Sequence, residues 1–167
     1  MRKTKPPIHK PKGIYAKRLR ILRDEVLAVV PDDEFNMSTW GRLNCGTSAC
    51  AMGQAAFHPR LRAEGLRLRL VQPDPELSGI TQVNVQAVYK TDTDTFENEE
   101  AGEKFFGLTQ PQAWWLFGDC YGKSLEEVTR KEVMRRITLL LAGRVYARHP
   151  GRERMPGFSN ADRMIAR

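Results

Sequence analysis

The chain has 167 residues, of which 27 are Lys or Arg and 20 are Asp or Glu, so its formal net charge is +7. Hydrophobic residues make up 41% of the chain and charged residues 28%. This balance and this length suit one globular domain with tails, and they exclude a fully disordered chain, a collagen and a coiled-coil fibre. No apolar run approaches the roughly 18 residues that a membrane helix needs, so we expect no membrane association.

The first residues and the cysteines bear on where the protein is found. Residues 1–7 are basic and no apolar segment follows them, so we expect no secretory signal. Three cysteines in a chain without a signal favour reduced thiols and a cytoplasmic location. The sequence gives no reason to expect a bound cofactor.

Most of the basic charge lies at the two ends of the chain. Residues 1–23 hold nine basic residues and no acidic one, and residues 144–167 hold six basic and two acidic residues. The middle, residues 24–143, holds 12 basic and 18 acidic residues and has a net charge of −6. We therefore predict a basic extended arm over 1–13, a globular domain over 14–143 and a basic C-terminal tail over 144–167.

The arm and the start of the domain are the first candidate binding region. Pro6, Pro7 and Pro11 disfavour a helix there, and a basic extended arm can reach along a phosphate backbone or an acidic protein groove. A solvated tail that keeps the protein soluble explains the same charges. The cations that we assign to partner binding are Arg2, Lys3, Lys5, Lys10, Lys12, Lys17, Arg18, Arg20 and Arg23.

Apolar periodicity predicts two helices in the first third of the chain. The first begins at residue 13 or 14 and ends near residue 30, before Pro31. Its apolar stripe consists of Tyr15, Leu19, Leu22, Val26 and Val29. The second begins after a cap at Thr47 or Ser48 and ends before Pro59. It is rich in Ala and Gly, which predicts close contact with a neighbouring element.

Two strands and three more helices are expected after residue 64. Residues 65–71 alternate apolar and basic side chains, and residues 83–89 begin with a similar alternation, so we expect an antiparallel pair. Residues 91–95 are expected to form a polar loop. A helix is predicted over 97–106, with Gly107 as the C′ residue that follows it. Further helices are predicted over 109–117, with a capping box at Thr109 and Gln112, and from residue 124 or 129 to 142. The expected fold class is α+β, with about five helices and a small two-stranded antiparallel sheet in a single domain.

The most distinctive stretch is residues 40–53, which read Trp-Gly-Arg-Leu-Asn-Cys-Gly-Thr-Ser-Ala-Cys-Ala-Met-Gly. This block resembles that of a group of short phage and bacterial proteins with a Trp followed by Cys-Gly-Thr-x-Ala-Cys-x-x-Gly. Residues 105–109, Phe-Phe-Gly-Leu-Thr, are similar to the second block of that group. The resemblance covers about 35–142 and implies a shared fold and a phage or mobile-element origin, but no mechanism.

The same stretch is also similar to the nucleophile motif of bacteriocin-processing cysteine peptidases, Asp-Cys-Gly-x-Ala-Cys. Here there is one more residue between the cysteines, and Asn44 stands where that family has Asp. This resemblance implies Cys45 as a nucleophile, and a helix N-terminus favours a thiolate. His58, about 13 residues further along, is near 20 Å from Cys45 if one helix joins them, which is too far for a direct hydrogen bond. Otherwise Cys45 shapes the start of the helix and Cys50 belongs to the core.

Three further features of the sequence give weaker indications of function. Cys45, Cys50, His58 and Cys120 do not have a standard zinc spacing, so we assign no metal site. The helix–turn–helix corner at 98–117 is too acidic and apolar for a DNA-reading motif. Adjacent tryptophans cannot both face the core, so we expect one of Trp114 and Trp115 at a partner surface and assign Trp115 to it.

A basic cluster lies in and just before the first strand. Arg67 and Arg69 are expected on its open face, where they would bind phosphate or pair with the acidic helix at 97–103. Taken together, the sequence favours a non-catalytic accessory or interaction protein. It would contact nucleic acid or an acidic protein through the basic arm and the first helix. The alternative is a thiol-dependent hydrolase that uses Cys45.

Overall fold

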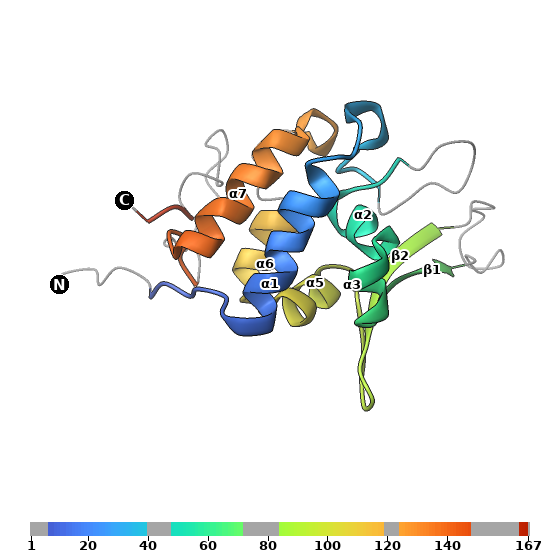
Figure 1. Ribbon diagram of the computed structural model, residues 1–167, viewed down its shortest axis with the longest axis horizontal. Helices are drawn as coiled ribbons and strands as arrows, with labels where there is room; N and C mark the ends of the chain where they lie inside the picture. The colour runs from blue at the N-terminus through green and yellow to red at the C-terminus, as the bar shows by residue number, and fades with distance from the viewer. Residues whose placement is uncertain (1–6, 40–47, 72–83, 119–123, 148–163, 167) are drawn as a thin grey trace.

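A computed structural model describes residues 7–39, 48–71, 84–118, 124–147 and 164–166. These residues form six α-helices and one three-stranded antiparallel sheet, so the α+β class is confirmed. The helices are α1 (Gly13–Ile21), α2 (Ala51–Phe57), α3 (Pro59–Ala63), α5 (Asn98–Phe106), α6 (Gln110–Phe117) and α7 (Arg130–Ala142). The strands are β1 (Leu66–Val71), β2 (Asn84–Lys90) and β3 (Thr95–Glu97). Helices α1 and α7 lie side by side at one end of the molecule and the sheet lies at the other (Figure 1).

The first helix begins where the sequence predicts but ends earlier. After α1 the chain makes a π-helical turn over Leu22–Leu27, in which the amide of Ala28 donates to the carbonyl of Arg23 at 3.1 Å. A π turn holds an extra residue, so the apolar face shifts along the sequence. Leu27 is buried as a result, whereas Val29, predicted to be part of the stripe, is 71% exposed.

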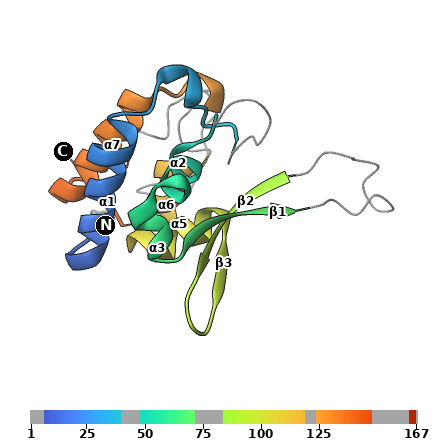
Figure 2. The same cartoon turned by 45° about the vertical axis from the view of Figure 1, so that its right-hand side comes forward.

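The sheet has one strand more than the sequence predicts. β1 pairs with β2 antiparallel, as expected, and β2 also pairs with β3. Residues 91–94, expected to be a loop, form the tight turn between β2 and β3, where the Thr91 amide donates to the Asp94 carbonyl at 2.9 Å. The three residues of β3 are too few to give an alternating pattern. This hairpin projects from the body of the molecule (Figure 2).

The helix rich in small residues packs in the centre of the fold. Residues 51–56 are all buried, and α2 lies against β1 and the π turn. The helix begins at Ala51, later than predicted, because Cys50 is its N-cap: its sulfur accepts from the amide of Gly53 at 3.5 Å. After His58 the chain turns into the short helix α3, whose first residue is Pro59.

The predicted caps of the later helices are confirmed. Gly107 ends α5 with φ 59°, and Thr109 and Gln112 form the capping box of α6. Of the two candidate starts of α7, the structure uses the second, where Thr129 accepts from the amide of Glu132 at 3.3 Å. No helix among the described residues is long and apolar enough to cross a membrane.

The described parts of both chain ends pack together on the helices. The amide of Ala147 donates to the carbonyl of Pro7, and the amide of Ala166 donates to that of Arg144, each at 2.8 Å. Met164 is 1% exposed. Residues 7–12 of the predicted extended arm, and residues 144–147 and 164–166 of the predicted C-terminal tail, therefore lie on the folded domain.

Candidate anion-binding groove

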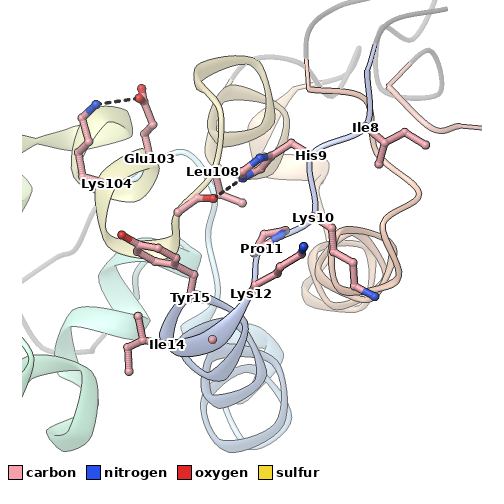
Figure 3. A pocket seen from close by; sticks show the side chains of 12 residues that line it. Ile8, His9, Lys10, Pro11, Lys12, Ile14, Tyr15, Glu103, Lys104 and Leu108 are labelled. Carbon is pink, nitrogen blue, oxygen red and sulfur yellow. Dashed lines mark hydrogen bonds and ion pairs between the residues drawn. The ribbon is translucent and has the colours of Figure 1, made fainter.

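An open groove of about 940 Å³ lies where the arm meets α1 and the end of α5. Residues 8–12 form one side, and Ile14 and Tyr15 of α1 form the floor. The other side comprises Glu103, Lys104, Gly107 and Leu108 (Figure 3). The groove thus combines the basic arm and the first helix, the two regions that the sequence assigns to partner binding.

One buried amide fixes the arm side of the groove. The Gln112 side chain is fully buried, and its Nε2 donates to the carbonyl of His9 at 2.9 Å and to that of Val145 at 3.3 Å. The ring of His9 reaches the carbonyl of Gly107, with Nε2 at 2.8 Å. Because a carbonyl only accepts, this nitrogen carries the proton. The arm is thereby held at a defined distance from α5.

The floor of the groove depends on the absence of a side chain at Gly107. A Cβ atom there would lie 2.3 Å from Cγ of Tyr15, and the backbone has a φ of 59°. Both conditions favour glycine, because a Cβ would overlap the ring and left-handed backbone is costly for other residues. Gly107 therefore allows the ring of Tyr15 to lie close against the α5–α6 turn, and Tyr15 is 40% exposed there.

The charge of the groove is mainly basic. Lys10 and Lys12 extend from the arm (Figure 3) and are exposed. On the opposite side Lys104 donates to Glu103 at 3.0 Å, and this hydrogen bond raises the pKa of Lys104. Lys17 and Arg20 follow Ile14 at three-residue spacing, so they continue the exposed basic stripe along α1. Within the described residues, none of Lys10, Lys12, Lys17 and Arg20 has an ion-pair partner.

Two of the predicted binding cations have structural roles. Arg18 is buried: its Nε donates to Glu64 at 2.6 Å, its Nη1 donates to the Phe105 carbonyl at 2.7 Å, and its guanidinium lies 4.1 Å from the Phe105 ring centre. It is a core cation, because the face of α1 that carries it turns toward α5. Arg23 forms two hydrogen bonds with Asp24, at 2.7 and 2.9 Å, and they lower the pKa of that carboxyl.

The assignment of the partner-facing tryptophan is wrong. Trp115 is fully buried, and its ring lies 4.7 Å from the guanidinium of the buried Arg136. Trp114 is the exposed member of the pair, at 37%. The capping box starts α6 at Gln110 and so turns Trp115, with Gln112 and Leu116, toward the core.

Some of the predicted site residues lie outside the described part of the chain. They are Arg2, Lys3 and Lys5 of the arm, Cys45 of the thiol hypothesis, and Cys120 of the metal candidate. Cys50 is described and fully buried, and burial raises the pKa of its thiol to about 11. Among the described residues, no three His, Cys, Asp or Glu side chains come together in a way that would hold a metal ion.

The two arginines of β1, Arg67 and Arg69, differ in their surroundings. Arg69 forms an ion pair with Glu97, at the start of the acidic segment, and a hydrogen bond with Gln86 at 3.1 Å. Of the two alternatives, phosphate binding and pairing with the acidic segment, the structure therefore shows the second for Arg69. Arg67 is exposed and faces a hollow of about 370 Å³ that also touches Phe57 and Leu70.

Sequence reasoning missed how the groove is assembled. His9, Tyr15 and Gln112 come from segments up to 103 residues apart, and no local pattern signals that they meet. The one local sequence signal for the groove is the position of Gly107 as the residue that follows a predicted helix. Comparison of the chain with models of protein families, with curated proteins and with solved structures finds no match.

Proposed function

We propose that the protein is a non-catalytic interaction module that binds an acidic segment of a partner protein in the basic groove. The observation that carries this proposal is the set of four exposed cations, Lys10, Lys12, Lys17 and Arg20, that form no ion pair with a described residue. Lys10 and Lys12 line a groove large enough for several side chains, and Lys17 and Arg20 lie further along α1. Unpaired cations around a hollow attract an anionic partner and steer its approach.

An acidic protein segment fits the groove better than a nucleic acid does. Ile14 and Tyr15 expose 44% and 40% of their surfaces in it, and an interface buries such apolar groups against apolar side chains of a partner. Glu99 and Glu100 lie just beyond Glu103 on α5 and have no ion-pair partner within the described residues. A long phosphate backbone that crossed the groove would approach these carboxylates, which repel it.

The test compares a groove variant with a matched control of equal charge. Lys12→Gln, Lys17→Gln and Arg20→Gln together remove one exposed cation that lines the groove and two that follow it along α1. Lys90→Gln, Lys131→Gln and Arg135→Gln remove three exposed cations elsewhere. The probes are a labelled peptide that alternates Glu with Leu and a labelled single-stranded oligonucleotide, and fluorescence anisotropy reports binding.

We expect the groove variant to bind the peptide about tenfold or more weakly at low salt, and the control to stay within about twofold of the wild type. Equal losses in both variants would mean non-specific attraction to net charge and would contradict the proposal. Tighter binding of the oligonucleotide, with a salt slope that falls by about one per contact removed, would replace the acidic protein with nucleic acid.

A further inference from the structure

A second hollow lies next to the basic groove and has the opposite charge. It has a volume of about 460 Å³ and is lined by the N-terminal part of α5 together with Gln110, Ala113 and Trp114. Glu103 and Lys104 line both hollows, so the two share a border. In the second hollow Glu100 is exposed and Glu99 is half-buried, and neither forms an ion pair with a described residue.

The exposed apolar side chains concentrate at these two hollows. Seven large apolar residues in the described part of the chain are exposed: Ile8, Ile14, Tyr15, Val29, Phe57, Leu70 and Trp114. Four of them line the two hollows, three on the basic side and Trp114 on the acidic side. Exposed apolar groups that are surrounded by charged side chains are typical of a protein–protein interface.

Adjacent patches of opposite charge are complementary to a second copy of the same surface. A two-fold axis through the border between them sets the basic patch of one copy on the acidic patch of the other, and the reverse contact follows by symmetry. At the border, Glu103 of each copy then approaches Lys104 of its partner. The charges match in both halves of the contact, whereas a basic groove facing another basic groove would be repelled.

We propose that two copies of this chain associate through these adjacent hollows, with Lys10 and Lys12 of each copy facing Glu99 and Glu100 of the other. The inference rests on the proposed function in one respect, since it takes the acidic segment bound by the groove to be α5 of a second copy. The groove of the dimer is covered, so an acidic peptide competes with dimer formation.

Sedimentation velocity of the full chain, from about 1 to 100 µM protein, tests whether it associates. We expect a monomer–dimer equilibrium in dilute buffer that shifts toward monomer at about 0.5 M NaCl, where the Debye length is only a few ångströms. A monomer at every concentration in dilute buffer would overturn the proposal. Species that grow beyond a dimer would overturn the two-fold arrangement, because a closed contact stops at two copies.

Charge reversal identifies the surfaces. Lys10→Glu with Lys12→Glu alters the basic patch, and Glu99→Lys with Glu100→Lys alters the acidic one. We expect the dimer dissociation constant to rise about tenfold or more in each double variant alone. An equimolar mixture of the two variants should restore association, since both halves of the contact then join an acidic patch to a basic one. Association that persists in both variants, or a mixture that stays monomeric, would contradict the assignment.

Folding is checked in each variant by its thermal unfolding. Lysines in the first turn of α5 oppose the helix dipole, so Glu99→Gln with Glu100→Gln provides a milder form of the acidic-patch change. The same variants separate this inference from the proposed function. A chain with Glu99→Lys and Glu100→Lys that binds the acidic peptide but does not dimerise supports both. A wild type that binds the peptide and stays monomeric overturns self-association alone.

Discussion

At the scale of single residues, the groove depends on Gly107. Its left-handed backbone and the ring of Tyr15 at 2.3 Å from the Cβ position leave no room for a side chain. Gly143 offers a matched comparison, because it has a similar φ of 70° but its nearest neighbour is the flexible side chain of Lys10 at 3.2 Å. The two glycines therefore separate backbone strain from steric overlap.

We predict that Gly107→Ala lowers the free energy of unfolding by about 2–4 kcal/mol and that Gly143→Ala lowers it by about 1 kcal/mol. The larger loss arises because Tyr15 has to leave its position against the turn. Urea denaturation measures both values. Equal losses in the two variants would show that backbone conformation alone matters and that the Tyr15 contact does not.

Arg18 gives a second prediction at this scale. Arg18→Met removes a cation that holds Glu64 and the Phe105 carbonyl, and we expect it to cost about 2–3 kcal/mol of stability. Arg23→Met removes an arginine paired at the surface with its neighbour Asp24, and we expect a cost below about 1 kcal/mol. A smaller loss at Arg18 than at Arg23 in urea denaturation would contradict the core role of Arg18.

The buried thiol of Cys50 leads us to predict that the free energy of unfolding depends on pH above about pH 9. Its thiol has a pKa of about 11 in the folded protein, raised by burial from 9.0. The unfolded chain therefore loses this proton first, and the contribution of Cys50 is complete below pH 9 and declines as the pH rises toward 11. Comparison with Cys50→Ala isolates the effect: the stability difference between wild type and variant should shrink by about 2–3 kcal/mol over this range. A difference that does not change with pH would contradict it.

At the scale of elements, Gln112 links the α5–α6 corner to the two chain ends. Its amide holds the carbonyls of His9 and Val145, and its oxygen accepts from the amide of Thr109 at 3.3 Å in the capping box. The chain ends and the helix cap thus share one side chain. Its loss should loosen the arm without unfolding the helices.

We predict that Gln112→Leu speeds hydrogen exchange at the Ala147 amide, which bonds to Pro7, by about tenfold or more, while the amides of α7 exchange as before. Thr109→Ala removes the cap of α6, at a cost of about 1 kcal/mol, but leaves both carbonyl contacts of Gln112 in place. It should therefore leave Ala147 protected. Equal exchange at Ala147 in the two variants would contradict the role of the amide.

Local signals predict the elements well where the rule involved is local. The starts of α1, α6 and α7, the glycine at the end of α5 and the antiparallel pairing of β1 with β2 follow from caps and periodicity. The π turn, the three-residue strand β3 and the Cys50 cap leave no such pattern, because tertiary contacts decide them. Which tryptophan faces the core depends on the exact start of α6, and here the sequence-based choice of Trp115 is wrong.

The site is less predictable than the fold for a physical reason. The sequence identifies basic residues, but exposure and pairing decide which of them can bind a partner. Arg18 and Lys17 are neighbours in sequence, yet the first is a core cation and the second is exposed. The groove itself arises from contacts between residues 8–15 and 103–112, whose separation along the chain hides them from any local pattern.

At the scale of the whole molecule, the charges form a basic face and an acidic face that adjoin. Lys10, Lys12, Lys17 and Arg20 make up the basic face, and Glu99 and Glu100 on α5 belong to the acidic one. The net charge of +7 is therefore a poor guide to binding, because the position of each charge decides which anion it meets. In our proposals, an acidic peptide and a second copy of the chain are alternative occupants of one groove.

The most direct test of the basic groove is to map where an acidic peptide binds. Nuclear magnetic resonance of the full chain, titrated with a peptide that alternates Glu and Leu, reports shift changes residue by residue. We predict the largest changes at residues 8–15 and 103–108, and their loss when Lys12, Lys17 and Arg20 are all replaced by Gln. Changes centred instead on Arg62 and Arg67, beside β1, would contradict the assignment of the groove as the binding site.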